Sequence, residues 1–198
     1  TAIAAGMLKG SRATTRDAEK AYVQSWIDKP GRPRTWVRLP KSLWPREWFK
    51  EDGTAKFTDP VVILEKSPYG HPESGPMWDK RMHQVMKQCG SLPLEGSPGF
   101  FYHPVEEVEM IVYVDDSVLI TPNGKDDKIW SQLDRHIKFK EPAAILDRFL
   151  GVYHHFEHYK DGTVRLKTEG EKYLKAVTAR YMQEAGVKQL SYVPSPSI

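Results

Sequence analysis

The chain has 198 residues, of which 39% are hydrophobic and 28% are charged, and its formal net charge is +3 at pH 7. This length is enough for a domain with a buried core, and no apolar run of the sequence is long enough to cross a membrane. The single cysteine, Cys89, excludes an internal disulfide and a zinc site built from cysteines. Residues 1–50 hold 11 Lys and Arg against 4 Asp and Glu, so this basic segment is either solvated surface or a contact for a phosphate backbone.

The first third of the chain is predicted to be extended and rich in loops. The sequence does not begin with Met, so we expect it to be part of a longer polypeptide, and residues 1–8 favour the end of a helix over a secretory signal. Segment 12–23 is rich in β-branched and small residues, which predicts an extended conformation. Pro and Gly mark residues 28–34 as a loop. Two short strands and the irregular aromatic segment between them are predicted at residues 35–40, 61–66 and 44–60.

Three amphipathic helices are predicted in the rest of the chain from their apolar spacing. The first starts at Gly75-Pro76, because proline suits the first turn of a helix. Its apolar face is formed by Trp78, Met82, Val85, Met86 and Cys89. The second helix is marked by Ile129, Trp130, Leu133 and Ile137. The third is marked by Tyr173, Leu174, Val177 and Tyr181, with Gly186 suited to its end.

Strands are predicted between these helices. Apolar runs predict strands at residues 99–104, 107–114 and 117–121, and the turn "YKDG" predicts a hairpin between segments 148–158 and 163–168. Several of these strands are joined by tight turns, which favours antiparallel pairing. The pattern therefore predicts an α+β fold with an antiparallel sheet and helices on one face, rather than a parallel doubly wound sheet.

Two adjacent aspartates, Asp115 and Asp116, interrupt the apolar strand pattern "MIVYVDDSVLI". Carboxylates among apolar neighbours are unfavourable unless a positive charge offsets them. One interpretation is an ordinary turn, since Asp is a common turn residue, although the Gly that usually supports a two-residue hairpin is missing. The other is a site for a hard cation such as Mg²⁺, which prefers oxygen ligands. A shared site for two ions needs a third carboxylate, and Asp17 in its extended segment is the best candidate.

Several segments resemble reverse transcriptases, and their order and spacing are most similar to those of copia-type long-terminal-repeat retrotransposons. "YVDD" between apolar strands looks like the catalytic hairpin of that family, and "DAEKAY", residues 17–22, looks like its first catalytic segment. "KSPYG", residues 66–70, followed by Trp78, resembles the segment that shapes the nucleotide and template site. "RFLGVYHHF", residues 148–156, resembles the segment that grips the primer. The resemblance covers nearly the whole chain.

The resemblance implies an RNA-directed DNA polymerase, a nucleotidyltransferase that extends a primer 3′-OH by a two-metal mechanism. It implies that Asp17 and Asp115 ligate two Mg²⁺ ions, with Asp116 in close support, and that Mn²⁺ can replace them. The Ala18 carbonyl would complete one coordination shell. Tyr22 would exclude ribonucleotides by a steric clash with the 2′-OH. The implied nucleotide-binding residues are Tyr22, Lys66, Tyr69 and Gly70, and the implied primer grip consists of Phe149, Leu150 and Gly151.

The resemblance also implies a fold and a setting. The expected fold is a polymerase palm with an antiparallel, ferredoxin-like core related in layout to RNA-recognition domains. Residues 1–147 would form the palm with a partial fingers insertion, and residues 148–198 the primer-grip hairpin and the start of the thumb helix. The expected partners are a primed RNA or DNA template, deoxynucleoside triphosphates, and the ribonuclease H and integrase regions of the same polyprotein. The expected location is a cytoplasmic virus-like particle, with no membrane.

Three alternatives remain open at this stage. The main one is a degenerate or domesticated palm domain that binds nucleic acid without catalysis, and the second is an inert relic with no partner. The third, a different two-metal nucleotidyl transferase such as a cyclase, is less favoured because Tyr22 and the grip segment would have no role in it. One loop departs from the family pattern, because Pro72 and Glu73 stand where the family usually has Lys and Gln. A catalytic palm should bind a divalent cation through its aspartates, whereas a plain binding module should not.

Other conspicuous side chains are interpreted as structural. His154 and His155 should point to opposite faces of a strand, so with His158 they are interpreted as polar surface rather than metal ligands. The tryptophans of segment 36–48 alternate with basic residues, a pattern that can stack on single-stranded bases, but packing of this loop against the palm is the preferred interpretation. Cys89 closes an apolar helical face and is expected in the core.

Overall fold

The structure is a computed structural model that describes residues 3, 10–27, 31, 33–122 and 124–191. Within these residues it contains antiparallel sheets and the α-helices α2, α3 and α4, so the expected α+β class is confirmed. Two predicted segments lie largely outside the described residues. They are the helix end at residues 1–8, of which only Ile3 is described, and much of the loop at residues 28–34.

The central sheet is antiparallel and has the strand order β4-β5-β6-β7-β1-β8. Its strands are β1 (Ser11–Asp17), β4 (Leu92–Pro93), β5 (Phe100–His103), β6 (Val108–Tyr113), β7 (Asp116–Pro122) and β8 (Ala144–Ile145). The first strand of the chain lies between β7 and β8, and it pairs with β7 over its whole length. This insertion brings the start of the chain next to the predicted "YVDD" hairpin.

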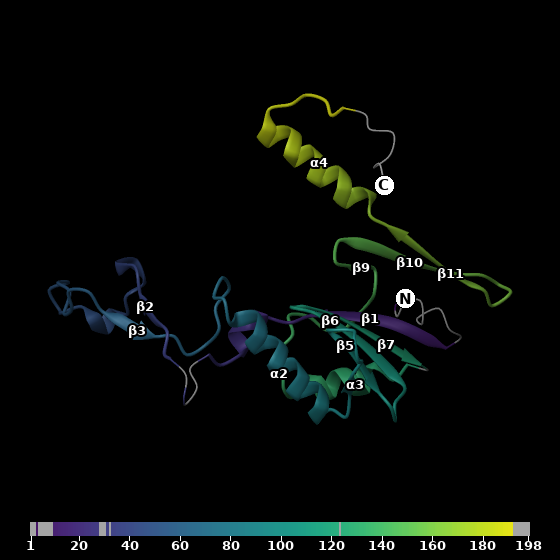
Figure 1. Ribbon diagram of the computed structural model, residues 1–198, viewed down its shortest axis with the longest axis horizontal. Helices are drawn as coiled ribbons and strands as arrows, with labels where there is room; N and C mark the ends of the chain where they lie inside the picture. Colours follow the sequence, from purple (N-terminus) through teal and green to yellow (C-terminus); the bar gives the residue numbers. More distant parts are fainter. Residues whose placement is uncertain (1–2, 4–9, 28–30, 32, 123, 192–198) are drawn as a thin grey trace.

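Helices α2 (Ser74–Gln88) and α3 (Asp126–Leu133) both cover one face of this sheet (Figure 1). The predicted apolar face of the first helix is confirmed by the burial of Trp78, Met82, Val85 and Met86. These side chains join Phe101, Met110 and Leu119 of the sheet in the larger core cluster. Cys89 is half-buried and packs against the edge of that cluster.

The second helix is shorter than its apolar spacing predicts. It ends at Leu133, and Ile137 is buried in the loop that follows. The chain leaves the helix because the next residues pair with the end of β1. The Glu19 N–H donates to the Lys138 carbonyl at 2.8 Å, and the Lys140 N–H donates to the Asp17 carbonyl at 2.9 Å.

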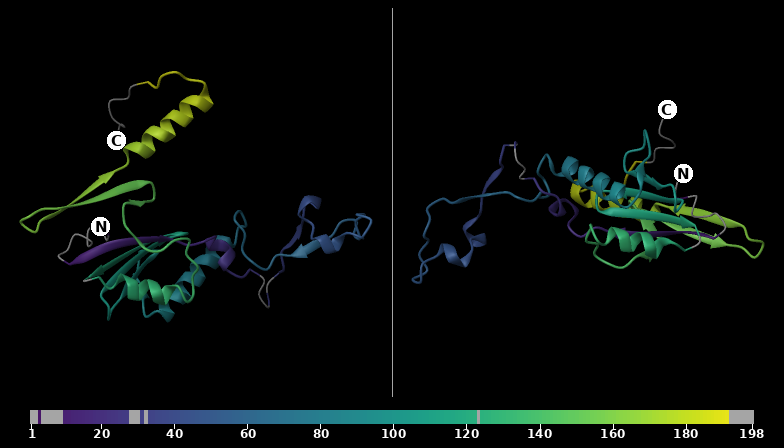
Figure 2. Two further views of the ribbon diagram at one scale, coloured as in Figure 1. Left: turned by 180° about the vertical axis from the view of Figure 1, so that it is seen from behind. Right: turned by 90° about the horizontal axis from the view of Figure 1, so that it is seen from below.

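The other face of the sheet carries the predicted hairpin (Figures 1 and 2). Strands β9 (Arg148–Phe149), β10 (Val152–His158) and β11 (Val164–Glu169) form a separate three-stranded sheet. Phe149 and Leu146 join Ala13, Ile111, Val118 and Ile120 of the central sheet in a second apolar cluster. Along β10, His154 is buried, so its interpretation as polar surface was wrong. His155 faces Glu169, and the alternation expected for these two histidines is confirmed.

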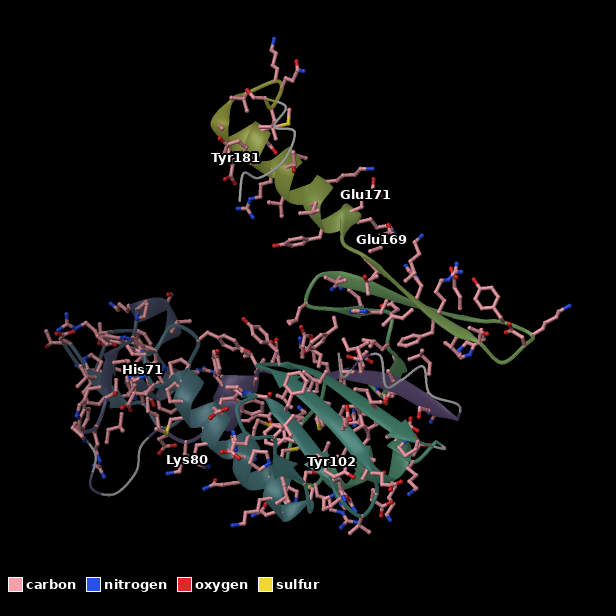
Figure 3. The ribbon with its side chains drawn as sticks, turned by 45° about the vertical axis from the view of Figure 1, so that its right-hand side comes forward. His71, Lys80, Tyr102, Glu169, Glu171 and Tyr181 are labelled. Atoms are coloured by element: carbon pink, nitrogen blue, oxygen red, sulfur yellow. The ribbon has the colours of Figure 1, made fainter. Side chains whose placement is uncertain are left out.

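Helix α4 (Glu171–Ala185) follows the hairpin and ends at Gly186, whose φ of 65° lies in the left-handed region that favours glycine. The predicted third helix and its end are therefore confirmed. No described residue of this helix is buried, and its apolar residues Tyr173, Leu174, Val177 and Tyr181 are all exposed. Figure 3 shows Tyr181 on the part of the helix that lies away from the sheet.

Strands β2 (Trp36–Arg38) and β3 (Val61–Ile63) form a small ribbon that projects from one end of the central sheet (Figure 2). The segment between them is irregular, as predicted, and is rich in aromatic residues. The Trp44 ring lies 5.7 Å from Trp48, and Trp48 lies 5.7 Å from Phe57, measured between ring centroids. These rings pack on one another within the segment. The preferred interpretation placed this loop against the central sheet, and that part of it was wrong.

Candidate active site

Asp17 and Asp116 are direct partners across the β1–β7 pair. Asp17 is the last residue of β1 and Asp116 is the first residue of β7. In an antiparallel pair such partners have Cα atoms about 4.5–5.5 Å apart, and their side chains point to the same face of the sheet. The register thus brings Asp17 beside the Asp115–Asp116 pair, as the hypothesis of a shared site requires.

The turn between β6 and β7 consists of Val114 and Asp115 alone. Val114 has a φ of 54°, a left-handed conformation that is costly for a β-branched residue. Two hydrogen bonds hold this turn. The Ala18 N–H donates to the Asp115 carbonyl at 2.7 Å, and the Trp78 indole N–H donates to the Val114 carbonyl at 2.8 Å. A tight turn is therefore built without glycine, and the two hydrogen bonds hold Val114 in its strained backbone conformation next to Asp115.

Like charges surround Asp116. Burial raises the pKa of this carboxyl, and the neighbouring charges of Asp115 and Asp17 raise it further. Arg148 and Lys140 act in the opposite direction. Since the negative charge is unfavourable here, a cation placed among these carboxylates would be bound favourably.

Lys140 supplies one positive charge at this site. Its Nζ lies 2.7 Å from Asp17 Oδ2, and this contact raises the pKa of Lys140. The other carboxylate oxygen, Asp17 Oδ1, is buried and has no hydrogen-bond partner among the described residues. The sequence carries no local signal for Lys140, because its partner lies 123 residues away.

The donor set fits a hard divalent cation. No three His, Cys, Asp or Glu side chains in the described part of the chain are clustered tightly enough to hold an ion by themselves. Mg²⁺ usually needs only one or two protein carboxylates, because water and substrate phosphates complete its shell. Asp17 and Asp116, with Asp115 beside them, offer oxygen ligands of this kind, and the unpartnered Oδ1 of Asp17 is an oxygen that a cation can satisfy.

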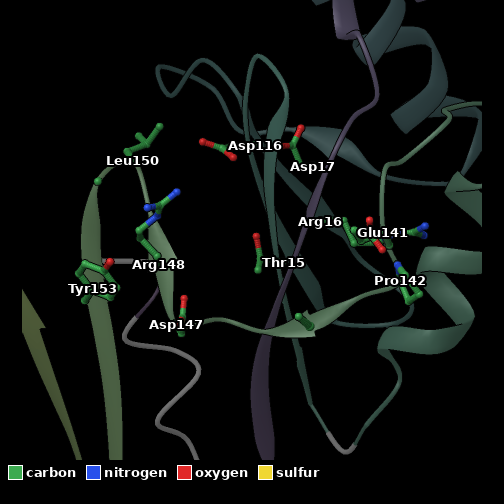
Figure 4. Close-up of a pocket in the computed structure, with 12 residues that line it drawn as sticks. Thr15, Arg16, Asp17, Asp116, Glu141, Pro142, Asp147, Arg148, Leu150 and Tyr153 are labelled. Carbon is green, nitrogen blue, oxygen red and sulfur yellow. The ribbon is translucent and has the colours of Figure 1, made fainter. Parts of the chain in front are cut away.

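A cleft of about 410 Å³ opens in front of the two paired aspartates (Figure 4). On the sheet side it is lined by Thr15, Asp17 and Asp116, and on the hairpin side by Arg148, Leu150, Gly151 and Tyr153. Two of the three predicted primer-grip residues, Leu150 and Gly151, therefore face this cleft. The Phe149 side chain is instead buried in the cluster beneath the hairpin, so any contact of this residue with a ligand would use its backbone.

The predicted nucleotide-binding residues Tyr22 and Tyr69 lie together. Tyr22 belongs to the short 3₁₀ helix η1 (Ala21–Gln24), and its ring centroid lies 4.8 Å from that of Tyr69. Burial raises the pKa of Tyr69, and the charge of Asp115 adds to this effect. Tyr69 is therefore in ring contact with Tyr22 and within electrostatic range of Asp115. Ala18 is buried directly after Asp17, and Gly70 turns the chain after Tyr69 with a φ of 88°.

Lys66 occupies a different environment from the other predicted site residues. Its Nζ lies 3.5 Å from the centroid of the Trp26 ring, and its backbone forms an isolated bridge with the same residue. Burial and the nearby charge of Arg81 lower its pKa. Lys66 is not among the charged groups that shift the pKa of Asp116. The structure therefore brings the aspartates and the two tyrosines together, and it places Lys66 against Trp26.

Basic residues near the start of the chain are partly engaged in ion pairs. Arg12 pairs with the buried Asp126 at the start of α3. Arg16 pairs with Asp134 at 2.8 Å and lies over the Phe139 ring. These contacts hold β1 to the helical side of the molecule, so part of the basic excess has a structural role.

In comparisons with known proteins, no family model and no curated protein sequence matches this chain. The resemblance to reverse transcriptases therefore depends on the quoted segments and their order. None of the helices that the structure describes is long and apolar enough to span a membrane.

Proposed function

We propose that this chain is the palm region of a copia-type reverse transcriptase, an enzyme that adds deoxynucleotides to a primer 3′-OH on an RNA or DNA template. The observation that carries the proposal is the pairing of Asp17 with Asp116 beside Asp115. An ordinary hairpin turn has no need of a third carboxylate from a strand about a hundred residues away. Two-metal nucleotidyl transfer does need one.

The three aspartates would hold Mg²⁺, with the Ala18 carbonyl as a further oxygen ligand. Ions held there would lower the pKa of the attacking hydroxyl and neutralise the charge that develops on the leaving pyrophosphate. Lys140 keeps one oxygen of Asp17 neutralised, which limits repulsion among the carboxylates. The aspartates are half-buried, which lowers the local dielectric constant in part and strengthens these interactions relative to bulk water.

Tyr22 and Tyr69 would form the wall against which the incoming nucleotide packs. The two rings are in contact, so Tyr69 supports Tyr22 and limits its movement. A bulky ring held in this way leaves no room for a 2′-OH, which selects deoxynucleotides by steric clash. The cleft between the aspartates and the Leu150–Gly151 turn would hold the end of the primer.

The second candidate function is a nucleic-acid-binding module without catalysis. The departure at Pro72 and Glu73 favours this alternative, because an acidic residue near a triphosphate site is unfavourable. Under the main proposal, the partners are primer–template and deoxynucleoside triphosphates, with ribonuclease H and integrase regions in the same polyprotein. The family setting would be a cytoplasmic virus-like particle.

Primer extension tests the proposal. The full chain is mixed with a labelled DNA primer annealed to an RNA template, deoxynucleoside triphosphates and Mg²⁺. We expect Mg²⁺-dependent extension that Asp17→Asn and Asp115→Asn each reduce by roughly a thousandfold. Asp127→Asn is the matched control, because Asp127 is exposed on α3 and belongs to another Asp-Asp pair in the chain.

Mn²⁺ binding, measured by electron paramagnetic resonance on the same variants, gives a readout that does not require turnover. We expect Asp17→Asn and Asp115→Asn to weaken Mn²⁺ binding and Asp127→Asn to leave it unchanged. Duplex binding without extension and without Mn²⁺ binding would favour the non-catalytic module. Extension that survives both aspartate substitutions would show that the site assignment is wrong.

A further inference from the structure

A small cavity lies on the helix-covered face of the central sheet, between α2 and the strands β5 and β6. Its volume is about 120 Å³. Apolar side chains from η1, α2, β5, β6 and the turn after β6 form most of its wall, namely Tyr22, Trp78, Met82, Phe101, Val112 and Val114. Trp78, Met82 and Phe101 are buried, so the floor of the cavity belongs to the larger core cluster.

This cavity is separate from the cleft that holds the aspartates. Asp116 lies on the same face of β7 as Val118 and Ile120, which belong to the apolar cluster beneath the hairpin. Val112 packs against the cluster on the opposite face of the sheet. The cleft and the cavity therefore lie on opposite faces of one sheet.

Two glycines that line the cavity shape its wall. A Cβ atom added at Gly99 would collide with the Val112 carbonyl oxygen, and the φ of Gly99 is 77°, so glycine is required at this close approach. At the start of α2, a Cβ atom added at Gly75 would meet no neighbouring heavy atom within 4 Å. The cavity is thus closed by backbone on the strand side and has free space beside Gly75.

The lining favours a single aromatic ring. A cavity of about 150 Å³ with apolar walls is large enough for benzene, so one of about 120 Å³ limits the occupant to one ring. Trp78 and Phe101 offer aromatic surfaces, and the Met82 thioether makes favourable contacts with aromatic rings. The Trp78 indole N–H is already donated to the Val114 carbonyl, so it offers a ligand no donor.

Asp79 supplies a negative charge at the mouth of the cavity. It is the charged residue among the described ones that line this space, and its side chain is 66% exposed. Its ion-pair partner His83 lies 3.6 Å away, which is longer than a hydrogen bond. The carboxylate oxygens can therefore accept from a ligand, and an amidinium or guanidinium group matches them in a bidentate contact.

We propose that this cavity binds a small molecule with one aromatic ring and one flat cationic group, with the ring against Trp78 and Phe101 and the cation at Asp79. Such a ligand would contact Tyr22 and Val114 from the side of the sheet opposite the aspartates. The site needs only the packing of α2 on the sheet, so it goes beyond the proposed function and does not rest on it.

Benzamidine and benzamide are suitable probes, because they have the same shape and only benzamidine carries a charge. The full chain, isotope-labelled at its methionine methyl groups, is titrated with each compound in EDTA and followed by nuclear magnetic resonance. We expect benzamidine to shift the Met82 signal with a Kd of about 1 mM and to leave the signal of Met182 on α4 unchanged. Benzamide should bind about fivefold more weakly, because the ion pair it lacks is solvent-exposed.

Two variants locate the ligand. Gly75→Leu places a side chain in the free space of the cavity, and we expect it to weaken the binding of both probes about tenfold or more. Asp79→Asn should weaken benzamidine binding about fivefold and leave benzamide binding unchanged, as a double-mutant cycle requires for a direct contact. Gly170→Leu and Asp161→Asn are the matched controls, because both positions are exposed to open space away from the cavity, and they should keep the wild-type Kd values.

Thermal unfolding of all variants checks that the substitutions leave the fold intact. The proposed site is refuted if neither probe moves the Met82 signal, if the two probes bind equally, or if Asp79→Asn weakens both probes to the same extent. It is also refuted if a folded Gly75→Leu variant keeps the wild-type Kd values. Should Gly75→Leu fail to fold, the Met82 shift and the Asp79→Asn comparison decide the outcome.

Discussion

Asp116 is a residue whose charge is unfavourable in the folded state. Its pKa is raised by burial and by the charges of Asp115 and Asp17, and Arg148 and Lys140 offset this only in part. Perturbed carboxyls of this kind are common at functional sites, where a bound cation or substrate makes up for the repulsion. The folded chain therefore holds a proton on Asp116 at pH values at which the unfolded chain has already lost it.

The stability of Asp116→Asn relative to the wild type should depend on pH. Because the folded pKa of Asp116 lies above the unfolded value of 3.8, the wild type loses stability as pH rises from about 3.8 through the raised pKa. In EDTA we expect Asn to stabilise the fold by roughly 1 kcal/mol at pH 7, since the charges are partly screened, and by nothing below the unfolded pKa. Urea unfolding at a series of pH values measures this difference.

Asp161→Asn is the control of opposite sign. Hydrogen bonds from Thr163 lower the pKa of Asp161, so its charge stabilises the fold above pH 3.8 and this contribution is lost as pH falls. We expect this substitution to destabilise the protein at neutral pH. A difference between Asp116→Asn and wild type that is flat with pH, or of the same sign as for Asp161→Asn, would contradict the electrostatic account of the site.

At the scale of elements, helices α2 and α3 each hold the sheet through one buried tryptophan. The Trp78 indole N–H donates to the Val114 carbonyl at 2.8 Å, and the Trp130 indole N–H donates to Thr14 Oγ1 at 2.9 Å. Their side chains are similarly buried, with 4% and 3% exposed. The difference is where they act, because Val114 lies in the strained turn before Asp115 and Thr14 lies inside β1.

Trp78→Phe and Trp130→Phe should separate stability from function. Each removes one hydrogen bond and leaves a small cavity, so we expect each to lower the unfolding free energy by about 2 kcal/mol. Only Trp78→Phe should weaken Mn²⁺ binding, because it releases the turn that carries the aspartates. Denaturant unfolding and Mn²⁺ titration measure the two effects. Equal loss of Mn²⁺ affinity in both variants would mean that α2 has no special role at the turn.

At the scale of the whole molecule, the two faces of the central sheet differ in the elements that cover them. One face is covered by α2 and α3 over the larger core cluster, and the other is partly covered by the β9–β10–β11 sheet over a smaller one. From the hairpin side, Leu146 and Phe149 are buried in that smaller cluster, and Phe156 of β10 packs against it. The width of the cleft in front of the aspartates therefore depends on a few side chains.

Phe149→Ala should detach the hairpin from the sheet. Removal of this buried ring is expected to cost about 3 kcal/mol, and Leu150→Ala, at a side chain that is 48% exposed, about 0.5 kcal/mol or less. Hydrogen exchange should accelerate in β9 and β10 of Phe149→Ala before it accelerates in β6 and β7. If the two variants lose the same stability, or if β6 and β7 open first, the hairpin is not held through Phe149.

Much of the secondary structure was predictable because its signals are local. The apolar spacing at Trp78, Met82, Val85 and Met86 is a property of one stretch of chain, and it predicts a helix with one buried face whatever the partner is. Gly186 marks the end of α4 for a similar local reason, since few other residues accept its backbone conformation. The aspartate pair also marks the candidate site by itself, because charge within an apolar strand needs an explanation.

The tertiary structure alone decided which distant residues meet at that pair. The insertion of β1 between β7 and β8 sets Asp17 beside Asp116, and the pairing of residues 138–140 with the end of β1 delivers Lys140. The same packing places Arg148 across the cleft. These contacts join positions about a hundred residues apart, and a register is selected only when both faces of the sheet find apolar partners. Local periodicity contains no information about such partners, which is why the burial of Phe149 and the exposure of the apolar face of α4 could not be predicted from the sequence.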